Sequence, residues 1–318
     1  MLIGILTGAT ASGKSALALR LAEELGCEIV SADSRQIYRG FRVGTGQPSR
    51  EERERVVHRF VDCVPPEENF SAGEFAREVV RLEKEDPGTP RLVAGGTGFY
   101  VAALVRGLPP LPSADMKIRN ALRDELRERG ARALRDELER VDPETAARLP
   151  ESDVRRVARA LEVFRATGRP FSWWKDRAEA PFPETPLAVL ERDPAENRAL
   201  IEARVRGMFR AGWADEARGL LESGVPEDAP AFGSLGYPQA LRVARGEMGE
   251  EEAIAEVTLR TAQYAKRQRT FFRGQLPGAR RCPAGDGALE FLRGLFRPVP
   301  GRKSGKSAPE NANFADSP

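Results

Sequence analysis

The sequence is poor in the residues that build metal sites and disulfide frameworks. It contains one histidine and three cysteines, Cys27, Cys63 and Cys282, which lie far apart and form no CxxC pair. We therefore expect neither a zinc site nor a disulfide-stabilised secreted fold, and such cysteine usage is typical of a reducing compartment. The single histidine, His58, stands in a charged stretch that we interpret as a surface helix.

Long apolar runs are also missing. No stretch approaches the roughly 18 consecutive apolar residues of a membrane-spanning helix. The short apolar run from Met1 to Leu6 has no basic segment before it, unlike a secretory signal. We therefore expect a cytoplasmic protein that has no membrane partner and acts as a monomer.

The chain has almost no excess of charge of either sign. It carries 50 Lys and Arg residues against 48 Asp and Glu residues, a net charge of +2. A surface for nucleic acid would therefore require clustering of charge. Arginine supplies nearly all the positive charge, which suits phosphate recognition, although genome-wide base composition is the simpler explanation. With 318 residues, the chain can bury one large core or one core with a sizeable insertion.

Short apolar segments alternate with helical stretches in the first third of the chain. Residues 2–7, 27–31 and 91–94 have the composition of buried strands, and a helix is expected over residues 15–25. This alternation is typical of a parallel sheet covered by helices. We predict a three-layer α/β core with a parallel sheet.

A proline cluster at Pro109, Pro110 and Pro112 interrupts this pattern. Beyond it, Val154 and Leu161 belong to an apolar stripe with helical spacing. We predict a helical insertion over residues 113–182, between a first part of the core at 1–112 and a second part at 183–297. The second part begins with an expected strand at 187–190 and ends in helices. Residues 298–318, rich in Gly, Ser, Lys and Pro, are predicted to be a disordered tail.

A phosphate-binding loop follows the first expected strand. Residues 8–15 match the motif G-x-x-x-x-G-K-[ST], in which backbone N–H groups surround a diphosphate. Its members are Gly8, Ala9, Thr10, Ala11, Ser12, Gly13, Lys14 and Ser15. Lys14 would reach a phosphate oxygen, and Ser15 would ligate Mg²⁺. The motif predicts diphosphate binding rather than an ordinary glycine turn, and a core like that of P-loop NTPases. It does not identify the diphosphate.

The usual apparatus for NTP hydrolysis is incomplete. The strand expected at 91–94 runs into Gly95, Gly96 and Thr97 instead of ending in the metal-binding Asp of many NTPases. A carboxylate, Asp33, instead follows the second expected strand. Ligands of open α/β sheets bind at this edge. Asp33 is therefore a candidate for chemistry other than hydrolysis.

Several segments, taken in their order and spacing, resemble the tRNA dimethylallyltransferase family, also called tRNA isopentenyltransferases. They are residues 8–15, 31–38, 95–100, 153–162, 168–172, 204–208, 236–237 and 263–268. The resemblance covers nearly the whole chain except the tail. It implies transfer of a dimethylallyl group from dimethylallyl diphosphate to N6 of adenosine 37, beside the anticodon of tRNA. Two departures are Ala9, where the family usually has Pro, and Leu200, where many members carry a further Arg.

The resemblance also implies roles for single residues. Asp33 would accept the proton of the adenine amine, Thr97 would donate a hydrogen bond toward the diphosphate, and Arg204 would neutralise its charge, together with Mg²⁺ at Ser15. The residues assigned to the anticodon stem-loop of tRNA are Asp33, Ser34, Arg35, Gln36, Arg119, Arg155, Arg156, Arg159, Gln263, Lys266 and Arg267.

Simpler interpretations exist for each of these residues. Asp33 also suits a turn or a helix cap, and Arg204 or the 263–267 stripe suits a solvated helix face. Two other functions remain open as well. A P-loop small-molecule or nucleotide kinase would use the insertion as a lid and turn over ATP, whereas an RNA-binding module with a vestigial loop would not bind diphosphate. Competition of ATP at the loop also remains open.

Overall fold

A computed structural model describes residues 1–111 and 115–296. Six parallel strands form one sheet in the order β3-β2-β4-β1-β5-β6. The strands are β1 (Leu2–Gly8), β2 (Glu28–Ser31), β3 (His58–Arg59), β4 (Arg91–Gly95), β5 (Leu187–Glu191) and β6 (Arg280–Pro283). The four strands expected from the sequence are confirmed, and so is the parallel α/β fold class.

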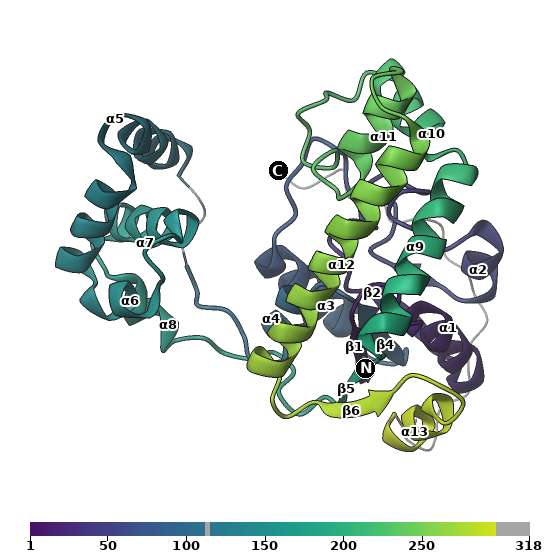
Figure 1. The fold of residues 1–318 in the computed structure, drawn as a ribbon. Helices are drawn as coiled ribbons and strands as arrows, with labels where there is room; N and C mark the ends of the chain where they lie inside the picture. The colour runs from purple at the N-terminus through teal and green to yellow at the C-terminus, as the bar shows by residue number, and fades with distance from the viewer. Residues whose placement is uncertain (112–114, 297–318) are drawn as a thin grey trace. The chain divides into compact units, whose positions relative to one another are not determined.

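Helices cover both faces of the sheet (Figure 1). The chain moves one way across the sheet from β1 to β2 and the other way from β4 to β5, and right-handed connections then place their helices on opposite faces. One face carries α1 (Lys14–Leu25), α2 (Arg50–Arg55) and α13 (Ala288–Leu295). The other carries α3 (Ala72–Glu85), α4 (Gly98–Val105), α9 (Pro194–Arg210) and α12 (Glu250–Gln275). Two further helices, α10 (Trp213–Glu222) and α11 (Tyr237–Ala244), pack against α9 and α12 respectively.

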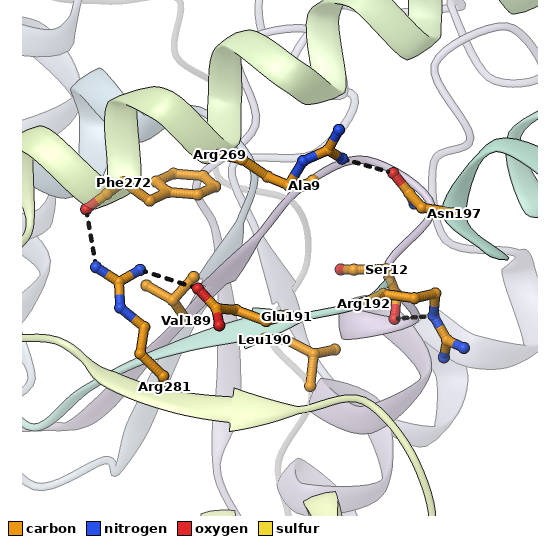
Figure 2. Close-up of a pocket in the computed structure, with 10 residues that line it drawn as sticks. All are labelled: Ala9, Ser12, Val189, Leu190, Glu191, Arg192, Asn197, Arg269, Phe272 and Arg281. Carbon is orange, nitrogen blue, oxygen red and sulfur yellow. Dashed lines mark hydrogen bonds and ion pairs between the residues drawn. The ribbon is translucent and has the colours of Figure 1, made fainter. Parts of the chain in front are cut away.

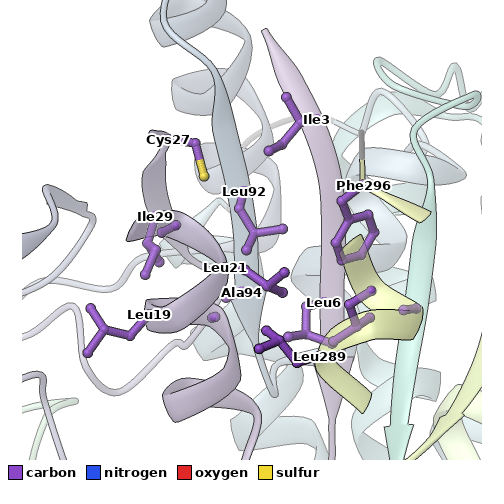
Figure 3. Packing of buried hydrophobic residues seen from close by; sticks show 14 of the residues in the cluster. Ile3, Leu6, Leu19, Leu21, Cys27, Ile29, Leu92, Ala94, Leu289 and Phe296 are labelled. Atoms are coloured by element: carbon purple, nitrogen blue, oxygen red, sulfur yellow. The ribbon is translucent and has the colours of Figure 1, made fainter. Parts of the chain in front are cut away.

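The core between α1, α13 and the sheet is apolar and closely packed (Figure 3). Leu6 of β1 and Leu92 of β4 lie against Leu21 of α1, and Phe296 closes the cluster beside β1. A side chain at Gly4 would collide with the Phe296 ring, because a Cβ there would lie 2.1 Å from it. This packing fixes β1, and with it the loop that follows at its carboxyl end.

A second compact unit is entirely helical. It spans Arg106–Pro181 and contains α5 (Met116–Val141), α6 (Pro143–Arg148), α7 (Val154–Thr167) and α8 (Phe171–Lys175). Its own core includes Leu122, Leu138 and Leu161. The insertion predicted at 113–182 corresponds to this unit, and the other unit joins Met1–Val105 to the described residues from Phe182 onward. The tail predicted at 298–318 lies outside the described residues.

Two short strands were not expected, and one of them corrects an interpretation. His58 lies in β3, opposite Ile29, and not in a surface helix. It is half-buried, and burial lowers the pKa of its imidazole. β3 has only two residues and β6 begins with two arginines, so neither shows the alternation that reveals a strand in a sequence. Within the described ranges, no helix combines the length and apolar content that crossing a bilayer requires.

Candidate active site

Four loops meet at the carboxyl edge of the sheet. The phosphate loop follows β1, Asp33 follows β2, Gly96 and Thr97 follow β4, and Arg192 follows β5. The strands are parallel and in register, with Thr7 opposite both Gly95 and Val189. Their ends therefore lie at one level, where open α/β sheets bind their ligands.

The phosphate loop presents a buried lysine at the start of α1. Gly13 precedes it with a φ of 94°, a backbone conformation that glycine adopts without strain. The Lys14 side chain is only 8% exposed, and its Nζ donates to the Ala9 carbonyl at 3.3 Å. Burial lowers the pKa of Lys14 to about 8, against the raising effect of the Asp33 charge. Among the described residues, no carboxylate forms an ion pair with Lys14, so its charge remains available to a ligand.

The two serines of the loop differ in environment. Ser15 is exposed in the first turn of α1. Ser12 is buried, and its hydroxyl has no hydrogen-bond partner among the described residues. Residues 1–111 and 115–296 contain no cluster of three acidic, His or Cys side chains that could hold a metal. A magnesium ion here would thus take few protein ligands, and Mg²⁺ commonly binds through substrate phosphates and water.

Asp33 forms a turn and also acts on the cations of the site. Its Oδ1 accepts hydrogen bonds from the backbone N–H of Arg35 at 2.9 Å and of Gln36 at 3.4 Å. This is the turn that its residue type suggests. Desolvation lowers the pKa of both Lys14 and Arg204, and the negative charge of the same carboxylate opposes part of this lowering. The charge of Asp33 therefore acts on both cations, while one of its carboxylate oxygens holds the turn.

Thr97 and Gln36 contact protein groups around Asp33. Thr97 Oγ1 accepts from the Ser34 backbone N–H at 2.9 Å and donates to the Ser34 hydroxyl at 3.3 Å. Gln36 Nε2 donates to the Gly46 carbonyl at 2.7 Å. Arg35 is exposed and donates to the Pro230 carbonyl at 3.2 Å. The predicted residues 33–36 and Thr97 are therefore brought together in one place.

Arg204 on α9 closes another side of the site. Its Nη2 donates to the Thr45 carbonyl at 3.4 Å, and no carboxylate pairs with it in the part of the chain that the structure describes. Arg204 is an exposed residue by its surface area, yet the protein atoms around its guanidinium lower its pKa by desolvation. Gly46 leaves room for it, since a Cβ there would lie 2.3 Å from Nη2.

Glu216 fixes the loop against which Arg204 rests. Its carboxylate accepts hydrogen bonds from the backbone N–H groups of Arg42, Val43 and Gly44 at 3.0, 2.7 and 3.2 Å. The Tyr237 hydroxyl donates to it as well, at 2.7 Å. Sequence reasoning missed Glu216, because three consecutive amides facing one carboxylate leave no local pattern.

Two amide side chains hold the phosphate loop from outside, and both were also missed. Gln268 of α12 accepts from the Thr10 N–H at 2.9 Å and donates to the Gly96 carbonyl at 2.7 Å. Asn197 of α9 donates to the Thr10 carbonyl at 3.0 Å and accepts from Arg269 at 3.0 Å. A signal for Gln268 did exist, because it is a polar residue at the helix position between buried Ala265 and Phe272.

A small pocket adjoins the phosphate loop between β5, β6, α9 and α12 (Figure 2). Arg192, Arg269 and Arg281 line it, and Arg192 Nε donates to the Ser12 carbonyl at 3.3 Å. Glu191, which pairs with Arg281 at 3.6 Å, offsets part of this charge. Arg192 thus holds the phosphate loop by a hydrogen bond to its backbone, and the arginines of the pocket add positive charge near the loop.

The residues predicted for tRNA fall on both units. On α12, Gln263, Lys266 and Arg267 are exposed. In the helical unit, Arg119 and Arg159 both pair with Glu162, at 3.3 and 2.7 Å. Arg155 and Arg156 are both exposed, and Arg156 Nε donates to Asp153 at 2.6 Å.

Comparison with known proteins identifies relatives along most of the chain. The family model described as IPP transferase matches residues 36–275. The tRNA dimethylallyltransferase of Geobacter sulfurreducens is 43% identical, with 85% of this chain and 88% of that protein covered. The enzyme of the same name from Deinococcus radiodurans is 42% identical over 93% and 96% of the two chains.

A solved structure shows the same fold. The tRNA isopentenylpyrophosphate transferase of Bacillus halodurans superposes with a TM-score of 0.66 at 30% identity, covering 93% of this chain and 96% of that one. The resemblance noted from the sequence motifs is thus confirmed by the family match, by the relatives and by the fold. The chain belongs to the IPP transferase family.

Proposed function

We propose that the protein transfers a dimethylallyl group from dimethylallyl diphosphate to N6 of adenosine 37 in tRNA and releases diphosphate. The relatives named above are tRNA dimethylallyltransferases and a tRNA isopentenylpyrophosphate transferase. One observation carries the proposal within this chain. A carboxylate, Asp33, acts electrostatically on two cations, Lys14 and Arg204, that have no carboxylate partner of their own among the described residues.

Such a site suits attack by a weak nucleophile on a carbon that bears a good leaving group. The lone pair of N6 is delocalised into the adenine ring, so a base must take its proton as the new C–N bond forms. Asp33 would accept that proton. The C–O bond to diphosphate breaks at the same carbon, and Lys14, Arg204 and the loop N–H groups would neutralise the departing charge.

Mg²⁺ and tRNA complete the proposal. The exposed hydroxyl of Ser15 would hold the ion, which when bound neutralises further charge on the diphosphate. Adenosine 37 must leave its stack to reach a site at the edge of a sheet. The exposed side chains of Arg35, Lys266 and Arg267 would contact the RNA backbone. A tRNA substrate agrees with the cytoplasmic location expected from the cysteine usage, and the monomeric state remains a prediction.

The test uses unmodified tRNA, dimethylallyl diphosphate labelled in its prenyl group, and ATP in a parallel reaction. We expect label to enter the RNA, with one diphosphate released per group transferred. A tRNA with guanosine at position 37 should accept no label, because the exocyclic amine then occupies another ring position. ATP consumption without labelling of the RNA would reject the proposal in favour of a P-loop kinase. Absence of both activities together with intact tRNA binding would favour the binding module.

A further inference from the structure

We propose that Gln268 is a positioning residue that fixes the phosphate loop relative to the loop that carries Asp33. The inference rests on the proposed function only in naming the reaction that depends on this spacing. Gln268 stands on α12, far along the chain from both loops. It is 6% exposed, and both ends of its amide are used.

The Gln268 amide joins the loop after β1 to the loop after β4. The pairing of these two strands ends at the edge of the sheet and does not extend into the loops. Its Oε1 accepts from Thr10 in the phosphate loop at 2.9 Å, and its Nε2 donates to the Gly96 carbonyl after β4 at 2.7 Å. A Cβ on Gly96 would lie 2.7 Å from Gln268 Nε2 and 3.4 Å from Lys14 Nζ. Gln268, Gly96 and the phosphate-binding lysine are therefore close neighbours.

From Gly96 the contacts continue to the proposed base. The next residue, Thr97, donates its backbone N–H to the Ala32 carbonyl at 3.0 Å and accepts from Ser34 at 2.9 Å. Ala32 and Ser34 flank Asp33 on both sides. A continuous series of hydrogen bonds thus runs from Thr10 through Gln268 and Thr97 to the neighbours of Asp33.

The residue type matters for this role. A glutamine amide accepts at one end and donates at the other without adding charge. A glutamate in its place would keep the bond from Thr10 but could not donate to Gly96 when ionised, and it would bring negative charge beside the diphosphate site. Asn197 holds the Thr10 carbonyl from α9 at 3.0 Å, so the loop is held on two sides.

A matched control exists in a second buried glutamine, which joins two helices instead of two loops. Gln239 of α11 is 5% exposed and donates to Glu256 of α12 at 3.0 Å. Glu256 precedes Gln268 by more than three helical turns, about 18 Å along the axis at 1.5 Å per residue. Gln239→Ala therefore removes a comparable bond without touching either loop.

The experiment measures binding of inorganic diphosphate in the presence of Mg²⁺ by calorimetry, and prenyl transfer under steady state. We expect Gln268→Ala to weaken diphosphate binding about tenfold, the scale of one lost buried hydrogen bond. We expect its kcat to fall about 100-fold, as for small misplacements of reacting groups. The KM for tRNA should stay within about twofold, since no direct RNA contact is assigned to Gln268.

Gln268→Glu keeps the side-chain volume and guards against a folding failure of the alanine variant. Its diphosphate binding should be weaker than that of the wild type and should approach it as the pH falls, because a protonated carboxyl can donate to Gly96. Gln239→Ala should lose thermal stability while diphosphate affinity and kcat stay near wild type.

Equal effects of Gln268→Ala and Gln239→Ala on diphosphate affinity and kcat would overturn the proposal, and so would a Gln268→Glu variant that matches the wild type at every pH. Diphosphate binding separates this inference from the proposed function. Diphosphate binding by the wild type that weakens in Gln268→Ala but not in Gln239→Ala, without prenylation of tRNA, would contradict the function and support the positioning role. A wild type that does not bind diphosphate would contradict both.

Discussion

The cations of the phosphate site and the arginines of the helical unit use their positive charge differently. In the α/β unit, the hydrogen bonds of Lys14 and Arg204 go to backbone carbonyls. In the helical unit, arginines face carboxylates. Arg165 bridges Glu125 and Glu137 with contacts of 2.6 Å to each, and Glu162 takes two arginines at once.

The difference shows that pairing, more than the number of arginines, decides where an anionic ligand can bind. A guanidinium that pairs with a carboxylate loses that ion pair when it binds a phosphate instead. The gain from the new ion pair and the loss of the old one then largely cancel. A desolvated cation without such a partner gains the full interaction when an anion arrives. The lowered pKa of Lys14 reflects the cost of keeping its charge desolvated before a ligand binds.

The largest effect is expected from the residue that acts on both cations. Asp33→Asn keeps an oxygen that can accept from Arg35 and Gln36, so the turn should survive. It removes the proton acceptor, and general-base catalysis contributes about 10² to 10⁴-fold. We expect kcat for prenyl transfer to fall within that range while the Kd for tRNA stays near wild type. Normal turnover by the Asp33→Asn variant would show that Asp33 only shapes the turn.

Removal of the lysine of the phosphate loop should have the next largest effect. Lys14→Gln deletes a charge that forms no direct ion pair with a carboxylate of the described chain, and a charged hydrogen bond contributes about 1.5–3 kcal/mol. We expect the affinity for inorganic diphosphate to drop by about ten- to a hundredfold. The comparison variant is Arg165→Gln in the helical unit. It should lower the thermal stability and leave diphosphate binding unchanged, and a loss of diphosphate binding there would contradict the contrast drawn above.

The pH dependence should reveal the same unpaired lysine. Lys14 is charged below its pKa of about 8 and neutral above it. Since kcat/KM reports the free enzyme, its value for the prenyl donor should fall about tenfold per pH unit above this pKa. Lys14→Arg, whose guanidinium stays charged, should retain activity to higher pH. A wild-type profile that stays flat to about pH 9.5 would argue against a desolvated Lys14.

The smallest effect concerns RNA binding and compares three exposed arginines, of which Arg156 forms an ion pair with Asp153. Arg267→Ala on α12 should weaken tRNA binding and lower the slope of log affinity against log salt by about one. Arg156→Ala, which removes an arginine already bound to Asp153, should change the slope less. Arg155→Ala tests the exposed neighbour on the same helix, and we expect it to resemble Arg267→Ala. Equal slopes for all three variants would show that ion pairing does not govern this surface.

Much of the fold could be predicted from the sequence because its signals are local. The apolar runs that became β1, β2, β4 and β5 are contiguous, and the residues of the phosphate loop are consecutive. β3 and β6 were missed because each is short and charged. His58 was assigned to a helix for the same reason, since the composition of its surroundings says nothing of pairing with Ile29.

The candidate site was only partly predictable. Motif order brought Lys14, Asp33, Thr97 and Arg204 into consideration, and the structure places them around one edge of the sheet. It could not show that Gln36 and Thr97 bond to Gly46 and Ser34 in the protein itself. Such contacts depend on which side chains the loops bring within hydrogen-bond distance.

The sequence by itself determined the position of the diphosphate loop, the alternation of strands and helices, and the family. Each of these features has its signal in segments of neighbouring residues. Only the tertiary structure decided which cations keep their charge and which groups fix the loops. Gln268 lies 258 residues from Thr10 and 172 from Gly96, and Glu216 lies 172 from Gly44. No local pattern encodes partners at such separations, because only the packing of α9, α10 and α12 over the sheet brings them together.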